Sequence, residues 1–245
     1  MNRRDRRRLE SLGESPETTN SSKAVNAAKA RVRAAETRLD DNDMVGAVEA
    51  LKEAQRLDPE NSRAWFISAM IAFNAGRIIE AGDAILKASL YDDKDPTIHA
   101  NCAAIMNLCD RPMEAEASAR HAISIASDMP EAYCNLGVAL EAQGKLPDAR
   151  EALTKAVDLR PGYADALISL GNLWFRAGDH VSAAESFASA VSSHPENAMA
   201  RTNLAVALRH LGELVSAEQQ CLEAIALDQS YAEAHNALGN VRLQL

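Results

Sequence analysis

Apolar and small residues recur along most of this chain at the spacing of paired amphipathic helices. In residues 130–163 the members within each helical stretch are related by steps of three or four positions, so they share one helical face. The set comprises Tyr133, Leu136, Gly137, Leu140, Gly144, Ala149, Leu153, Ala156 and Pro161. Gly144 separates the two stretches, and Pro161 marks the end of the second. The segment therefore predicts two helices joined by a short turn.

The same pattern returns at a shift of 34 positions, with no insertion or deletion. One column lies at the expected crossing of the two helices: Ala35, Ala69, Ala103, Gly137, Gly171, Ala205 and Gly239. Two further columns lie on the second helix: Ala47, Ala81, Ala115, Ala149, Ala183 and Ala217, then Ala54, Ala88, Ala122, Ala156, Ala190 and Ala224. Only small side chains let helix backbones approach to about 8 Å. Unrelated amphipathic helices would not repeat these columns at a fixed period.

The pattern divides the chain into a short tail and a long array. Residues 1–22 start with five arginines and continue into a polar stretch, so we expect a disordered Arg-rich tail. The array is expected over 23–245, with the first helix of a seventh unit at 232–245. The six full units are 28–61, 62–95, 96–129, 130–163, 164–197 and 198–231.

Over residues 28–245 the chain resembles the tetratricopeptide repeat (TPR) family, on the aromatic, Leu-Gly, Ala and Pro positions of residues 130–163. The resemblance implies an all-α fold, an α-α right-handed superhelical solenoid of helical hairpins. It implies little about function, because such arrays serve unrelated partners.

Charge and composition exclude several classes of function. The net charge is −9. Residues 1–27 carry a charge of +2 and the remaining residues carry −11, so the array itself is acidic. An acidic array is a poor ligand for nucleic acid, whose binding rests on Lys and Arg. No apolar run approaches the ~20 residues that span a bilayer, and no apolar segment follows the N-terminal arginines as in a secretory signal. The four cysteines form no CxxC pair, so we expect reduced thiols in a cytoplasmic protein.

No catalytic constellation is apparent, and we expect neither a cofactor nor a metal. The six histidines fall on different helices or turns, without an HExxH, GxSxG or Walker motif. His99 and His235 take the place of Trp65 and Tyr133 in their repeats, which predicts half-buried packing residues. Two cysteines, Cys102 and Cys221, occupy apolar core positions. Cys134 falls on the inner face, where its thiol would be accessible.

In this architecture the first helix of each unit lines the concave face. The sixth repeat position places Asn101, Asn135, Ser169 and Asn203 there, and the ninth adds Asn172 and Asn240. An amide offers a donor and an acceptor, which match a peptide backbone. Helices spaced about 8–10 Å apart would offer one amide for roughly three residues of an extended chain. The alternative is that these asparagines serve packing or solubility.

The other groove positions carry mixed chemistry, and the apolar ones can hold side chains of an extended or helical ligand. Acidic Glu131, Glu141 and Asp165, basic Arg176, Arg209 and His210, and apolar Ile168, Phe175 and Met199 share this face. The regular register and the asparagines resemble the arrays that precede the catalytic region of O-linked N-acetylglucosamine transferases. By that resemblance Asn101, Asn135 and Asn203 would hold a partner's backbone, whereas Ser169 and Ala237 interrupt the row.

Three functions remain open. The first is a cytoplasmic, non-catalytic scaffold that binds an extended peptide segment of a partner protein. The second is the substrate-recognition part of a larger, for example bacterial, protein glycosyltransferase acting on a protein such as flagellin, with its catalytic domain after Leu245. The third is a scaffold that self-associates through its last helix, where Val241, Leu243 and Leu245 have no expected partner helix. Of the second and third, we favour continuation of the chain as the reason for these apolar residues.

Overall fold

The structure is a computed structural model that describes residues 16–245, with side chains from Ser21 onward. The five arginines between Arg3 and Arg8 lie outside these described residues, as does most of the expected tail. Within the described range the chain folds into helices and turns, and no strand is present. The expected all-α fold of repeated helical hairpins is confirmed.

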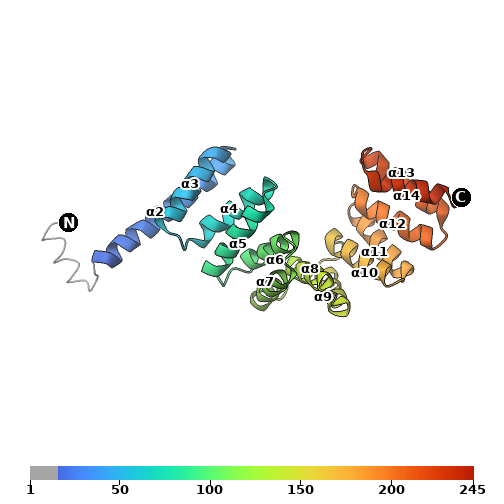
Figure 1. The fold of residues 1–245 in the computed structure, drawn as a ribbon, viewed down its shortest axis with the longest axis horizontal. Helices are drawn as coiled ribbons and strands as arrows, with labels where there is room; N and C mark the ends of the chain where they lie inside the picture. Colours follow the sequence, from blue (N-terminus) through green and yellow to red (C-terminus); the bar gives the residue numbers. More distant parts are fainter. Residues whose placement is uncertain (1–15) are drawn as a thin grey trace. The chain divides into compact units, whose positions relative to one another are not determined.

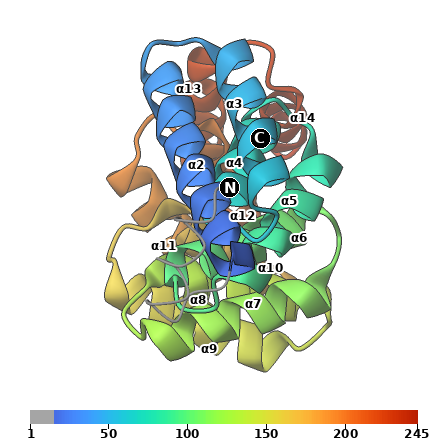
Figure 2. The same ribbon diagram turned by 90° about the vertical axis from the view of Figure 1, so that its left-hand side faces the viewer.

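The chain divides into two units, residues 1–109 and 110–245. In the first unit α2 packs against α3 and α4 against α5, each as a helical hairpin, and α6 packs on α5 (Figure 1). Figure 2 shows α2 and α3 side by side. The helices are α2 (Pro16–Asp40), α3 (Met44–Leu57), α4 (Ser62–Asn74), α5 (Ile78–Tyr91) and α6 (Pro96–Leu108).

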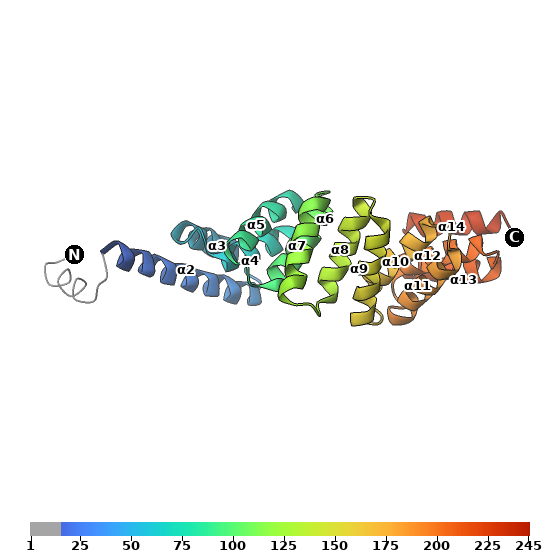
Figure 3. The ribbon, with the colours of Figure 1, turned by 90° about the horizontal axis from the view of Figure 1, so that it is seen from below.

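The second unit stacks three hairpins between two single helices. The hairpins are α8 with α9, α10 with α11, and α12 with α13, while α7 packs on α8 and α14 on α13. Figure 3 shows the antiparallel pair α8 and α9 clearly. The helices are α7 (Pro112–Ile125), α8 (Pro130–Ala142), α9 (Leu146–Leu159), α10 (Ala164–Arg176), α11 (His180–Ser193), α12 (Ala198–His210), α13 (Leu214–Leu227) and α14 (Ala232–Arg242).

The helix starts repeat with the sequence. First helices begin at Ser62, Pro96, Pro130, Ala164, Ala198 and Ala232, each 34 positions after the last. The turn between the two helices of a hairpin needs a left-handed residue, which ends the first helix. Gly144 takes φ 76°, and in the first unit Asn42 takes φ 61° at the equivalent position. Both residue types tolerate this conformation, which is why the turn at Gly144 was predictable from the sequence.

The helices of the second unit meet through side chains whose sizes are matched in pairs. A Cβ built on Gly137 would lie 2.5 Å from Cγ of Leu153, and one on Gly171 would lie 2.5 Å from the ring of Phe187. In the next hairpin the equivalent crossing residue is Ala205, and the residue equivalent to Phe187 is the smaller Cys221, fully buried. At these two crossings a glycine therefore faces a large side chain, because that side chain fills the space that a Cβ would occupy.

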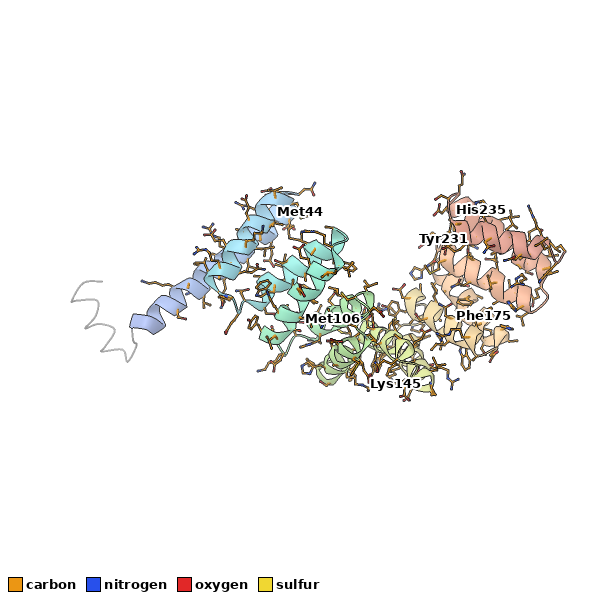
Figure 4. The ribbon with its side chains drawn as sticks, viewed as in Figure 1. Met44, Met106, Lys145, Phe175, Tyr231 and His235 are labelled. Atoms are coloured by element: carbon orange, nitrogen blue, oxygen red, sulfur yellow. The ribbon has the colours of Figure 1, made fainter. Side chains whose placement is uncertain are left out.

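Glu116 of α7 joins α7 to the start of α9. Its carboxylate accepts hydrogen bonds from Nζ of Lys145 at 2.8 Å and Nε2 of Gln143 at 2.8 Å, and from Nε of Arg120 at 2.9 Å. Figure 4 shows Lys145 at the beginning of α9. These donors, Lys145 first, hold the pKa of Glu116 at about 2, well below the ordinary 4.5, although burial opposes the shift.

We expect this lowered pKa to make part of the stability of α7–α9 depend on pH. A carboxylate whose pKa is lower in the folded state stabilises the fold above its unfolded pKa of about 4.5, and the gain disappears as the pH falls toward 2. Glu116→Gln should therefore reduce the free energy of unfolding at pH 6 and make little difference near pH 2. Urea titrations of both proteins across this range measure the difference. A constant difference at all pH values would show that the charge of Glu116 is irrelevant.

The last helix differs from the sequence expectation at one residue. Val241 was expected to lack a partner, yet it is fully buried, in a cluster with Ala205, Ala217 and Leu238. The tenth position of the repeat faces the preceding hairpin, so α14 needs no following helix to cover it. Leu243 and Leu245 are exposed as expected, at 87% and 63%.

Candidate functional site

The first helices of the second unit form one continuous wall. Helix α8 contacts α10, α10 contacts α12, and α12 contacts α14. The second helices α9, α11 and α13 do not approach one another to this extent within residues 110–245. The side on which successive helices come closer is the inside of a curved stack. We call the surface that α8, α10, α12 and α14 present on this side the inner face.

The structure brings together two of the predicted amides. Nδ2 of Asn203 on α12 donates to Oδ1 of Asn172 on α10 over 3.4 Å, so these side chains bridge neighbouring repeats. Asn240 on α14 is exposed, while Asn135 and Ser169 are half-buried. Asn101 belongs to the first unit, and its amide donates to the carbonyl of Thr97 at 2.8 Å. Asn172 and Asn203 thus form a pair that links α10 to α12.

Three of the predicted charged residues, Glu131, Glu141 and Arg176, form ion pairs. Arg176 on α10 donates to Glu141 on α8 at 2.5 Å, and Glu131 accepts from Arg160 at 2.5 Å. Asp165, at the start of α10, is exposed and is not engaged in an ion pair. Glu131 and Asp165 lie in the first turns of α8 and α10, and Arg176 and Arg209 lie in the last turns of α10 and α12, where each sign complements the helix dipole. Glu141 is the exception, because it lies near the C-terminus of α8. The charge pattern of this face is therefore partly a consequence of helix stability.

A cluster of rings and cations lies where α10 and α12 end. The ring of Phe175 lies 4.8 Å from that of His180 and 5.1 Å from that of His210, and the two imidazoles are 4.6 Å apart. Nη2 of Arg209 lies 3.0 Å from Nε2 of His210. Figure 4 marks Phe175 on α10. Sequence reasoning placed Phe175, Arg209 and His210 on this face but missed His180, which begins the second helix α11.

The accessible thiol expected at Cys134 is not present, because Cys134 is only 4% exposed. The side chain of Tyr163 hydrogen-bonds to the thiol. Burial, with the nearby charge of Asp165, raises the pKa of Cys134 to about 12, so the thiol stays protonated at neutral pH. This position contributes packing, not reactivity.

The other cysteines and histidines considered from the sequence differ in their burial. Cys102 and Cys221 are fully buried as predicted, and none of the four cysteines forms a disulfide. His99 is more buried than expected, at 7% exposure, whereas His235 is exposed with Nε2 3.0 Å from the carbonyl of Gln229.

No cluster of three His, Cys, Asp or Glu side chains in the described range is arranged to hold a metal. None of the described helices combines the length and apolar character that a bilayer crossing requires.

A second concavity lies on the opposite side of α8 from the inner face. It has a volume of about 1150 Å³ and opens between α7 and α9, with Tyr133, Leu136 and Leu140 of α8 as its floor. Trp174 closes one end, where the guanidinium of Arg150 lies 4.7 Å from the ring centroid. Sequence reasoning missed this groove because its floor residues read as ordinary packing positions.

This geometry agrees with the comparison with known families. The tetratricopeptide repeat model matches residues 26–97, 111–164, 134–193 and 168–232, which together cover most of the chain. The chain belongs to the tetratricopeptide repeat family. No sequence match is found among proteins with curated functions.

Solved structures share the fold at low sequence identity. PilW, a widely conserved type IV pilus biogenesis factor, superposes with a TM-score of 0.74 at 19% identity, covering 86% of this chain and 98% of its own. YrrB, a TPR protein with an unusual peptide-binding site, gives 0.62 at 20% identity over 74% of this chain and 95% of its own. MamA from Desulfovibrio magneticus RS-1 gives 0.61 at 22% identity over 70% and 97%. These similarities show the fold.

Proposed function

We propose that this protein is a non-catalytic scaffold that binds an extended peptide segment of a partner protein on its inner face. The observation that carries the proposal is the bridge between Asn172 and Asn203 across two successive first helices. At 3.4 Å this hydrogen bond is long, so a peptide can replace it at little energetic cost. The family membership supports a role in protein interaction, and a similar fold in YrrB has a peptide-binding site.

The spacing of the helices suits an extended chain, which advances about 3.3 Å per residue across helices packed about 8–10 Å apart. Once their mutual hydrogen bond is broken, the amides of Asn172 and Asn203 would each meet a backbone group of such a chain. Asn240 on α14 is exposed and would serve the next contact along the segment. An amide can accept from a backbone N–H and donate to a backbone C=O, so recognition would depend little on the partner's side chains.

Selection from a phage-displayed library of random linear peptides tests the proposal. We expect wild-type protein to enrich peptides, and we expect Asn172→Ala combined with Asn203→Ala to weaken their binding about tenfold, because two backbone contacts are lost. Fluorescence anisotropy with the selected peptides, synthesised and labelled, measures the change.

The matched control is Ser189→Ala combined with Ser192→Ala on α11. Both serines are exposed, and each hydroxyl donates only to a carbonyl of its own helix. This control should bind the selected peptides as the wild type does, with the same helical circular dichroism. If no peptide is enriched, or if both double variants bind equally well, the inner face is not the binding surface.

A further inference from the structure

Arg209 differs from the other arginines of the second unit in the group that its guanidinium contacts. Six of the arginines in residues 110–245 pair with glutamates, for example Arg176 with Glu141 and Arg242 with Glu218. Arg150 lies over the ring of Trp174. Arg209 is half-buried, and its guanidinium contacts the imidazole of His210. In a protein of net charge −9, a half-buried cation without a carboxylate partner is unusual.

The contact with Arg209 determines the state of His210. A guanidinium remains protonated and can only donate, so Nε2 of His210 accepts at 3.0 Å and the ring proton sits on Nδ1. The imidazole is therefore neutral in this arrangement. Burial, the charge of Arg209 and the neighbouring His180 all lower the pKa of His210, in this order. The free protein thus holds an uncharged histidine beside an arginine that lacks an anion.

No described carboxylate pairs with Arg209 or shifts the pKa of His210, although the carboxylate of Asp179 interacts electrostatically with His180. From α10 it faces the ring of Phe175, while Arg176 is engaged with Glu141 on α8. From α11 it faces His180, whose Nδ1 is buried without a hydrogen-bond partner. Asp179, just before α11, is directed to the backbone N–H and hydroxyl of Ser182. Arg209 and His180 are the charged or titratable groups that shift the pKa of His210, and no described carboxylate does so.

We propose that Phe175, His180, Arg209 and His210 form a docking site for an Asp or Glu side chain within the bound peptide segment. This inference rests on the proposed function, since the same helices α10 and α12 carry Asn172 and Asn203. Helix α14 extends the inner face beyond α12, so a bound chain continues past the cluster. The carboxylate is therefore assigned to a side chain inside the segment and not to a C-terminus.

Binding would couple to a proton. A carboxylate can take two hydrogen bonds from the guanidinium of Arg209, which frees Nε2 of His210. The new negative charge favours the imidazolium, so the pKa of His210 rises and the ring takes a proton from solvent. By linkage, the segment binds more tightly as the pH falls through the pKa of the bound histidine. The edge of Phe175 offers an apolar contact to the stem of the acidic residue.

A structural explanation of the same residues makes a different prediction. Arg209 and His210 lie in the last turn of α12, where positive charge stabilises the exposed carbonyl groups. If this were their only role, Arg209→Gln would lower the melting temperature slightly and leave peptide selection unchanged. The test therefore compares selection, and not stability alone.

The experiment applies the displayed library to wild type, Arg209→Gln and Arg150→Gln in parallel at pH 6 and pH 8. We expect wild type and Arg150→Gln to enrich an acidic residue at one fixed position, more strongly at pH 6, and Arg209→Gln to lose that enrichment. An amidated synthetic peptide from the selection should bind about tenfold better than its Glu→Gln version at pH 6, the size expected for one charge-assisted hydrogen-bonded pair. The NMR-measured pKa of His210 should rise when the peptide is added.

The other possible results distinguish a failure of the proposed function from a failure of the carboxylate site. If no peptide is enriched by any protein, the proposed function fails. Should peptides be enriched without an acidic preference that depends on Arg209, the peptide-binding function stands and the carboxylate site is overturned. Stronger binding of a free C-terminal carboxylate than of an internal Glu would overturn the assignment to a side chain. Circular dichroism melts of both arginine variants exclude misfolding as the cause.

Discussion

Phe187→Ala is expected to lower the free energy of unfolding of the second unit by about 3–5 kcal/mol, the range for truncating a buried aromatic residue. Phe187 is only 2% exposed, and it is the largest fully buried side chain described. Its ring fills the space left open by Gly171, with Leu167 and Leu204 in the same cluster. Removing the ring leaves a cavity that glycine cannot fill. Urea unfolding followed by circular dichroism measures the change.

The control for this substitution lies on the same helix. Val181→Ala changes a residue that is 55% exposed, and we expect an effect within about 0.5 kcal/mol. Hydrogen exchange adds a second measurement, because each hairpin of such an array contacts mainly its neighbours. Amides of α10 to α12 should lose protection in Phe187→Ala, while amides of α2 and α3 should not. Equal loss of protection along the whole chain would contradict this local account.

The parts of the fold that depend on local chemistry were predictable from the sequence. A left-handed turn residue such as Gly144 acts within its own turn, and the buried Ala149 and Ala183 act at a crossing that recurs in every repeat. A constant period makes each repeat a check on the others. Val241 escaped the prediction because its partners belong to the preceding hairpin. Exposure of Val241 was predicted only from its position in the last helix of the sequence.

For the candidate site, the sequence predicted only which face of the array its residues share. The period places Arg176 and Arg209 on the same side of the array, but it does not say which partner each side chain reaches. Arg176 pairs with Glu141, 35 residues away, whereas Arg209 contacts its sequence neighbour His210. Long side chains have many rotamers of similar energy, so these choices depend on the packed surroundings. His180 joins the cluster from the start of the second helix α11, a place about which the first-helix pattern makes no prediction.

Gly171→Ala is expected to destabilise the second unit even though alanine is the better helix former. The added Cβ would lie 2.5 to 2.9 Å from three ring atoms of Phe187, and a buried ring has little room to move. Overpacking of this kind costs about 1–3 kcal/mol, which outweighs the gain of up to about 1 kcal/mol from replacing a helical glycine. Gly239→Ala is the matched control. It occupies the equivalent position of α14, where no atom lies within 4 Å, so this change should stabilise the protein slightly.

The double variant Gly171→Ala with Phe187→Cys tests the reason for the glycine. It reproduces the pair Ala205 and Cys221, which the chain itself uses in the next hairpin. Phe187→Cys alone should be strongly destabilising, because the cavity remains beside Gly171. In the double variant the new methyl group enters the space that the ring has left. We therefore expect it to be more stable than the sum of the single effects by about 1–2 kcal/mol. Strict additivity in urea unfolding would mean that the two positions are not matched in size, and that the glycine at this crossing has another cause.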